Sequence, residues 1–384
     1  MKIKQLALII LIAFILFGCK DEKNDPEDDD PYKDVEPYVE VDANILDLPP
    51  MKELFSDYFL MGNIFNPADV SGGAVTNQRL TRHYNILTAE NHMKPQYIAT
   101  SATSYNFTTA DQMVDAAIAS GFKVVGHTLL WHSQNANWMS GSNANLSNMK
   151  QYISGVAGHF KGKIYSWDVL NEAFPDGVSA TGSWKTAMRS NNPWFATIGS
   201  DFVYEGFLAA RLADPGAILY YNDYNTDQLG KATMIRDMVR DVNARYKQEY
   251  PGETRLLIEG IGMQEHHNLG VPAANIKTTL DMFRPLGVKI SVSELDVLAQ
   301  TWGQYSSQAA VTQKGLEDQK KKYEEYFKLY LENSDIIERV SLWGVIDTQS
   351  WRARGKPLLF DENGMTKPAY HGVRIALNEK QRGK

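Results

Sequence analysis

The sequence of 384 residues is poor in cysteine and has no excess of positive charge. Cys19 is its only cysteine, so no intrachain disulfide can form, and a domain of this size must be stabilised by its core. The formal net charge is −7, so the chain offers no basic surface for nucleic acid. These absences indicate a large globular domain without disulfides and without nucleic acid as a partner.

The N-terminus carries an apolar run, residues 6–17, that follows Lys2 and Lys4. It has twelve residues, whereas a membrane-spanning helix needs about 20, so the run predicts the core of a secretory signal. Gly18 and Cys19 end it in a pattern that resembles the processing site of bacterial lipoproteins. We expect a signal peptide over 1–18 and a lipid anchor on Cys19 in the outer membrane, facing the cell surface; an ordinary cysteine in a cleaved peptide is the alternative.

The next segment, 19–50, is strongly acidic. Residues 20–50 hold twelve Asp or Glu against three Lys, which predicts a disordered linker. Its start, residues 20–22, resembles the acidic export tag of some surface lipoproteins, and a merely solvating linker is the alternative. With the signal and linker set aside, residues 51–384 carry no net charge, which favours a neutral substrate.

From residue 58 onward, short apolar runs alternate with longer amphipathic stretches. The candidate strands are 58–65, 86–90, 123–130, 165–171, 217–222, 256–263, 288–295 and 339–346, and the helical patterns include 111–120, 201–213, 231–250 and 317–332. Eight such alternations predict parallel strands joined by helices, as one (β/α)8 TIM barrel over 51–380. An open doubly wound sheet is the rival, but the first strand runs into Asn66 and Pro67 instead of a glycine-rich phosphate turn.

Two glutamates, Glu172 and Glu294, each follow an apolar strand pattern. A carboxylate is costly to place there unless it has a use, and the C-terminal ends of barrel strands form the active site of this fold. The other strand ends are also polar and aromatic. Two carboxyl groups, one protonated and one charged, are the catalytic groups that cleave a glycosidic bond.

Three motifs in this order, Gly-His-Thr-Leu-Leu-Trp-His (126–132), Trp-Asp-Val-Leu-Asn-Glu (167–172) and Ser-Glu-Leu-Asp (293–296), resemble glycoside hydrolase family 10, the retaining endo-β-1,4-xylanases. The resemblance covers nearly all of 51–377. It implies Glu172 as acid/base, Glu294 as nucleophile, and xylan or xylo-oligosaccharides as substrate. We expect no metal or cofactor, and the oligomeric state is open, with a monomer as the default. The residues that match substrate-binding positions of the family are Glu90, Asn91, Lys94, His127, Trp131, Asn171, Gln264, His266, Trp343 and Trp351. Glu265 departs from the family pattern, and its side chain is expected either to alter contacts with the leaving-group sugar or to point into solvent.

Three other functions remain open from the sequence. A metal-dependent hydrolase on the same barrel would use histidines such as His127 and His266, but their spacing fits no metal signature. A non-catalytic glycan-binding barrel would be expected to lack one of the two carboxylates. Activity on mixed-linkage glucan or cellulose would use the same catalytic groups and is the alternative hardest to separate.

Overall fold

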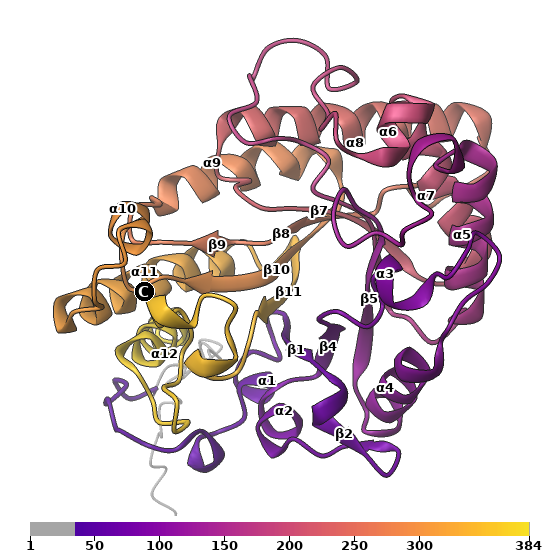
Figure 1. The fold of residues 1–384 in the computed structure, drawn as a ribbon. Coiled ribbons are helices and arrows are strands. Elements are labelled where there is room, and N and C mark those ends of the chain that lie inside the picture. The colour runs from indigo at the N-terminus through magenta and orange to yellow at the C-terminus, as the bar shows by residue number, and fades with distance from the viewer. Residues whose placement is uncertain (1–34, 384) are drawn as a thin grey trace, which may run out of the picture.

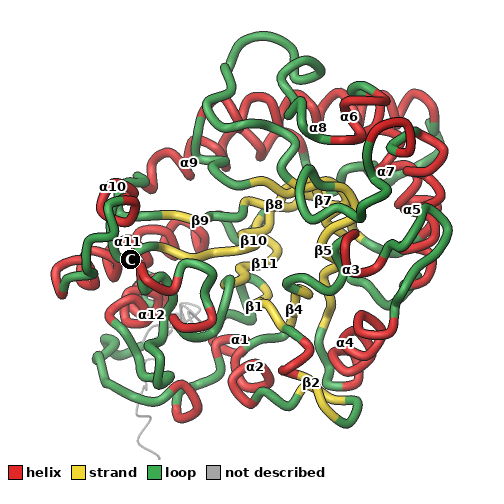
Figure 2. The backbone as a smooth tube through the Cα atoms, viewed as in Figure 1, coloured by secondary structure: helices red, strands yellow, loops and turns green. Residues whose placement is uncertain are grey.

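The protein folds into a closed barrel of parallel strands surrounded by helices (Figures 1 and 2). The computed structural model describes residues 35–383. Its large sheet has the order β11-β1-β4-β5-β6-β7-β8-β10-β9, and β10 also pairs with β11, which closes the barrel. The pairings of its strands are all parallel. The predicted (β/α)8 barrel is therefore confirmed.

The barrel strands lie close to the predicted ranges. They are β1 (Leu60–Phe65), β4 (Ile86–Ala89), β5 (Lys123–Leu130), β6 (Ser166–Asn171), β7 (Ile218–Asp223), β8 (Gly260–Met263), β10 (Lys289–Val297) and β11 (Ile337–Leu342). The short strand β9 (His266–His267) pairs with the last residues of β10, and β2 (Val70–Ser71) and β3 (Ala74–Val75) form a small separate hairpin. Strands covered on both faces are nearly continuously buried, which explains their apolar sequence.

Two predicted strands have different bounds in the structure, one at its start and one at its end. The predicted strand 256–263 is shorter, because the Asn243 side chain accepts from the Ile258 N–H (2.8 Å) and donates to its carbonyl (2.9 Å), so these groups need no strand partner. The predicted strand 339–346 stops at Leu342, because the chain turns at Gly344, where φ is +134°.

The outer helices follow the strands in alternation. They are α1 (Met51–Leu54), α2 (Gln78–His83), α3 (Pro95–Ile98), α4 (Thr108–Ala119), α5 (Leu146–His159), α6 (Pro193–Ile198), α7 (Asp201–Ala213), α8 (Leu229–Glu249), α9 (Ala273–Phe283), α10 (Trp302–Ser306), α11 (Gln313–Glu332) and α12 (Pro368–Gln381). On α11 the buried residues Tyr323, Tyr326, Phe327 and Tyr330 recur at helical spacing and turn one face to the core. Within residues 35–383, no helix is long and apolar enough to span a bilayer.

The prediction of a disordered linker through residue 50 is wrong for its last part. Ile45 lies in a short 3-10 helix and is fully buried, and its N–H donates to the Gly364 carbonyl at 2.8 Å. The Tyr38 hydroxyl lies 2.8 Å from His371 Nδ1 on α12. Apolar residues inside the acidic segment thus pack on the barrel, so residues 35–50 are not a disordered linker. The predicted signal peptide, Cys19 and residues 20–34 lie outside the described residues.

Candidate active site

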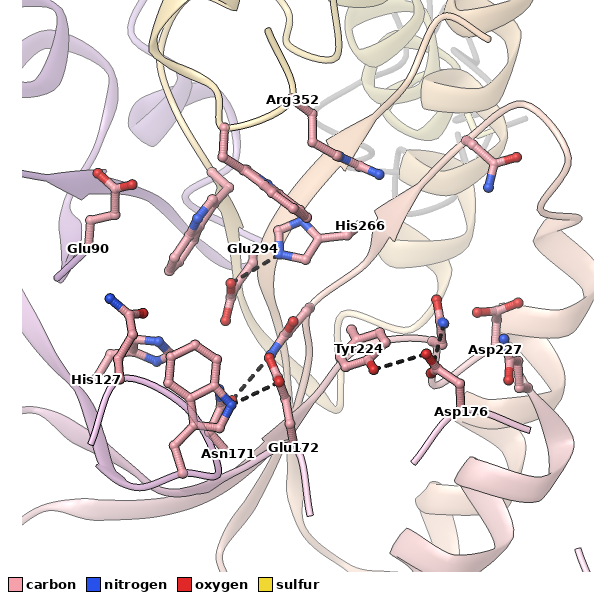
Figure 3. Close-up of a pocket in the computed structure, with 18 of the residues that line it drawn as sticks. Glu90, His127, Asn171, Glu172, Asp176, Tyr224, Asp227, His266, Glu294 and Arg352 are labelled. Carbon is pink, nitrogen blue, oxygen red and sulfur yellow. Dashed lines mark hydrogen bonds and ion pairs between the residues drawn. The ribbon is translucent and has the colours of Figure 1, made fainter. Parts of the chain in front are cut away.

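A cavity of about 810 Å³ opens at the C-terminal ends of the barrel strands. It is lined by every residue that the sequence singled out for catalysis or substrate binding, which are Glu90, Asn91, Lys94, His127, Trp131, Asn171, Glu172, Gln264, His266, Glu294, Trp343 and Trp351. Figure 3 shows Glu90 and His127 on one side of the two carboxyl groups, and Tyr224, Asp176 and Asp227 on the other. The cavity is therefore a cleft that passes over both glutamates.

Irregular backbone at the strand ends aims these side chains. Glu172 follows β6 directly and has φ of +55°, a conformation that few residues other than glycine adopt. The register of β10 against β11 shifts between Val292 and Leu295, on either side of Glu294. Bulges of this kind redirect a side chain that a regular strand would point elsewhere.

Glu294 is held as a buried carboxylate, 5% exposed. Asn222 Nδ2 donates to its Oε1 at 2.8 Å, and His266 Nε2 lies 3.1 Å from its Oε2. Burial raises the pKa of Glu294, but the hydrogen bond from His266, the attraction of His127 and the bond from Asn222 outweigh it, and the pKa lies below its ordinary value. Glu294 is therefore ionised at neutral pH, as a nucleophile must be.

His266 lies between two carboxylates. Its Nε2 faces Glu294, and its Nδ1 is 3.1 Å from Asp296 Oδ1. Burial lowers the pKa of His266, while the Glu294 carboxylate acts in the opposite direction. Asp296 also accepts from Trp351 Nε1 at 3.0 Å and pairs with Arg352, so its orientation is fixed from several sides.

Glu172 has a different environment. Trp131 Nε1 donates to its Oε2 at 2.8 Å, and Gln264 Nε2 donates to its Oε1 at 3.0 Å. His132 Nδ1 lies 3.8 Å from the same Oε2, and burial, with the nearby Arg189 guanidinium, lowers the pKa of His132 to about 4. The His132 imidazole beside Glu172 is thus uncharged at neutral pH.

An amide network joins the two carboxyl groups. With the Asn171 amide oxygen facing the cleft floor, it accepts from Asn222 Nδ2 at 2.9 Å and from Gln264 Nε2 at 3.2 Å. Asn222 also bonds Glu294, and Gln264 also bonds Glu172, so three side chains from three strand ends fix the pair relative to each other. Gly262 makes room for this network, since a Cβ there would lie 2.2 Å from Asn222 Oδ1.

The wall near β4 and β5 presents hydrogen-bonding groups and aromatic faces. Lys94 is 6% exposed, donates to Asn91 Oδ1 (3.1 Å) and Gln134 Oε1 (2.9 Å), and lies 5.1 Å from the centre of the Trp131 ring. Burial lowers the pKa of Lys94, and Glu294, Glu90 and Glu172 oppose that effect. Asn66 Nδ2 donates to Glu90 Oε2 at 2.6 Å, which holds that carboxylate at the rim.

Other side chains support this wall from behind. Asp168 Oδ2 lies 2.9 Å from His127 Nδ1, which leaves the opposite nitrogen of that ring for the cleft. Trp343 packs edge-on against His127 at 5.7 Å between ring centres.

Sequence reasoning missed several residues of the cleft. Gln134, Asp176, Asn225, Asp227, Gln228, Asn268, Val271, Trp302 and Arg352 also line it, as does Tyr224, and most of them come from loops with no regular spacing. Asn222 lies one residue before the end of β7, in the polar rim that the sequence shows after that strand, and it supports the site by bonding both the nucleophile candidate and Asn171.

Both expectations for Glu265 are wrong. Its side chain is buried and points behind the cleft wall, where His267 Nε2 lies 2.6 Å from its carboxylate and the Tyr330 hydroxyl donates to it at 3.1 Å. The backbone at Glu265 has φ of +58°. Gln264 and His266 line the cleft, while Glu265 between them faces away from it. Within residues 35–383, no three His, Cys, Asp or Glu side chains are grouped to hold a metal ion.

Comparison with known proteins agrees with this geometry. The chain is 34% identical over 343 residues to the endo-1,4-beta-xylanase of Geobacillus stearothermophilus, covering 85% of this chain and 98% of that protein. It is 33% identical over 353 residues to endo-1,4-beta-xylanase A of Thermotoga maritima, of which it spans only 31%.

Among solved structures, the chain superposes on a GH10 xylanase from termite gut that contains a bacterial Ig-like domain. The TM-score is 0.84 at 56% identity, over 91% of this chain and 81% of that one. The model of glycosyl hydrolase family 10 matches residues 50–376. The chain therefore belongs to glycosyl hydrolase family 10.

Proposed function

We propose that the protein is a retaining endo-1,4-β-xylanase, with Glu294 as nucleophile and Glu172 as acid/base. The observation that carries this proposal is the pair of carboxyl groups at one cleft, linked by the amide network and held in different environments. Membership of the family and the xylanase names of its relatives support the substrate class.

In the first half of the reaction, the Glu294 carboxylate attacks the anomeric carbon of the sugar bound towards Glu90. The glycosidic C–O bond breaks, and Glu172 gives its proton to the departing oxygen. The product is a glycosyl ester on Glu294 and a free leaving-group sugar. In this proposal Asn171, whose side chain is held by the amide network, bonds the sugar 2-hydroxyl, an interaction that strengthens in the transition state.

In the second half, Glu172 is a carboxylate and accepts a proton from water. The water oxygen attacks the anomeric carbon, and the ester bond to Glu294 breaks. Two displacements at one carbon retain its configuration. His266 and Asn222 donate to Glu294, so they stabilise the carboxylate as it leaves.

The wall formed by Glu90, Asn91, Lys94, His127 and Trp131 binds the non-reducing-side sugars in this proposal. Hydroxyl groups bond the Lys and Asn side chains, while Trp343 and Trp351 contact the apolar faces of the rings. A xylose ring has no C6 hydroxymethyl, so a wall closed over that edge admits xylan more readily than glucan.

We also propose that the protein is a lipoprotein, anchored through Cys19 to the outer membrane and exposed at the cell surface as a monomer. The support is the sequence pattern of the N-terminus, namely the short apolar run before Gly18 and Cys19 and the acidic stretch that follows.

Product analysis tests the proposed activity. Linear xylan is expected to lose viscosity rapidly, with products of intermediate length, and an aryl xylobioside is expected to release its aryl group. The Glu294→Gln protein is expected to lose turnover about 10⁴-fold or more while its unfolding transition is retained. Equal efficiency on cello-oligosaccharides would overturn the substrate assignment, and binding without any bond cleavage would favour a glycan-binding protein.

A further inference from the structure

Two exposed tryptophans lie at the same cleft. The chain has eight tryptophans, and the structure describes all of them. Trp302 is 59% exposed and Trp351 is 62% exposed, while the other six are buried or half-buried. Both exposed rings line the cavity over Glu172 and Glu294. A large aromatic side chain left in water beside a binding cleft indicates a contact surface for a ligand.

The ring of Trp302 is supported from behind. Helix α10 starts at Trp302, and its N-terminus is closed by a capping box in which Gln304 Oε1 accepts from the Thr301 N–H at 2.9 Å. The Tyr305 ring centre is 5.8 Å from that of Trp302, and the Arg354 guanidinium lies 4.4 Å from the centre of the Tyr305 ring. Arg354 also donates to the Tyr305 carbonyl at 2.7 Å. The exposed indole of Trp302 therefore lies on a helix start that is stabilised by its capping box and by contacts with Tyr305 and Arg354.

Trp302 belongs to the side of the cleft opposite Glu90 and Asn91. In the barrel order, β8 is four strands from β4 in either direction, so the loops after β4 and after β8 and β9 face each other across the mouth. The Leu269 N–H, just after β9, donates to the carbonyl of Gln300 at 3.0 Å, which places the start of α10 beside that loop (Figure 1).

Polar residues from the loops after β7 and β9 also line the cavity. Asp227 and Gln228 follow β7, and Asn268 follows β9, and all three line the same cavity. Figure 3 places Asp227 on the far side of Glu172 from Glu90. A cleft that offers an exposed aromatic face together with carboxylate and amide groups suits a pyranose ring, whose apolar face stacks while its hydroxyls form hydrogen bonds.

We propose that Trp302 is a stacking platform for a xylose unit on the leaving-group side of the scissile bond, beyond the sugar that contacts Glu172. This inference rests on the proposed function, because that function decides which end of the cleft holds the leaving group. Only substrates with several sugars on that side reach Trp302. The residue therefore raises affinity for long chains and takes no part in bond cleavage.

The test compares substrates of different reach in Trp302→Ala and Trp302→Phe. The substrates are 4-nitrophenyl β-xylobioside, which has no sugar on the leaving-group side, and xylohexaose. Leu212→Ala is the matched control, because Leu212 is an exposed apolar residue (67%) on α7 outside the cavity. Trp302→Ala is expected to raise KM for xylohexaose about tenfold, as for loss of one aromatic contact, with kcat/KM for the aryl xylobioside unchanged. Trp302→Phe is expected to recover most of that loss. Leu212→Ala is expected to leave KM for xylohexaose unchanged.

Two results would overturn the proposal. One is an unchanged KM for xylohexaose in Trp302→Ala. The other is an equal loss on both substrates, which would give Trp302 a part in catalysis or folding instead. If the unmodified protein cleaves neither substrate, the proposed function itself fails. In that case xylohexaose binding to the Trp302→Ala protein, measured by calorimetry against the unmodified protein, still decides whether Trp302 is a platform.

Discussion

Glu172 and Glu294 carry the same carboxyl group, and their neighbours give the two side chains different tasks at the residue scale. Glu294 is 5% exposed and receives hydrogen bonds from Asn222 and His266, so it is kept ionised. Glu172 is bonded by the neutral donors Trp131 and Gln264. Two carboxyl groups in distinct environments are what acid/base and nucleophile roles require.

Removal of the Glu172 carboxyl group should depend on the leaving group. We expect Glu172→Ala to slow hydrolysis of unactivated xylo-oligosaccharides by about 10²–10⁴-fold, because their alkoxide leaving groups need a proton. An aryl xylobioside with an acidic phenol should lose far less in its bond-cleavage step. Pre-steady-state release of the phenol measures that step, and an equal loss for both substrates would contradict the acid assignment.

The hydrogen bond from His266 predicts a pH effect. Burial raises the pKa of Glu294, but His266 and the other neighbours lower it by a larger amount. The active carboxylate therefore persists at pH values below the ordinary glutamate pKa. In His266→Ala the pKa of Glu294 should rise, and the acidic limb of the kcat/KM profile should move to higher pH. A limb that stays in place or moves to lower pH would show that His266 does not stabilise this carboxylate.

At the scale of elements, the break between β8 and β9 orients residues for both glutamates. Gln264 and His266 face the cleft from this break, and Glu265 between them is anchored behind it by His267 and Tyr330. The positive φ at Glu265 lies in this break, between the end of β8 at Met263 and the start of β9 at His266. Glu265 is therefore a buried support for this segment.

Glu265→Ala should weaken both stability and activity. It leaves the buried His267 and Tyr330 without their acceptor, so the free energy of unfolding should fall by about 3 kcal/mol. Because the segment loosens, kcat should fall at temperatures where the protein remains folded. Glu265→Gln, which keeps one acceptor oxygen, should recover part of both. Chemical denaturation and kcat measured together check this, and an unchanged stability would contradict the buried pairing.

At the scale of the whole molecule, the barrel is a neutral body joined to an acidic N-terminal segment. The described chain packs on α12 from Tyr38 onward. Fifteen residues lie between Cys19 and residue 35, and the sixteen Cα–Cα steps of that stretch span at most about 58 Å when fully extended. An anchored barrel would therefore remain within that distance of the membrane surface.

Replacement of the lipidation residue tests the proposed anchor. In cells that express the full chain, Cys19→Ala should move the protein from the membrane fraction to the soluble fraction, because no lipid can be attached. Metabolic labelling with a radioactive fatty acid should mark the unmodified protein alone. Residues 51–384 are unaltered, so xylan hydrolysis should not change. Equal fractionation of both proteins, or no label on either, would refute the anchor.

Much of this architecture could be predicted from the sequence, because a parallel barrel repeats one strand–helix unit and its strand ends converge. That convergence is why Glu172 and Glu294, 122 positions apart, could be paired. Loop residues such as Trp302 and Gln134 could not be found this way, since no period fixes where they fold. Charge alone also misplaced the linker boundary, because a few apolar residues such as Ile45 suffice to dock an acidic segment.

Capture of the covalent intermediate tests directly whether Glu294 is the nucleophile. The protein would be incubated with a 2-deoxy-2-fluoro xylobioside that carries an activated aryl leaving group, then digested with protease and analysed by mass spectrometry. We expect one fluoroxylobiosyl unit, attached to the peptide that contains Glu294. Turnover of the reagent without any adduct, or an adduct on a different side chain, would contradict it.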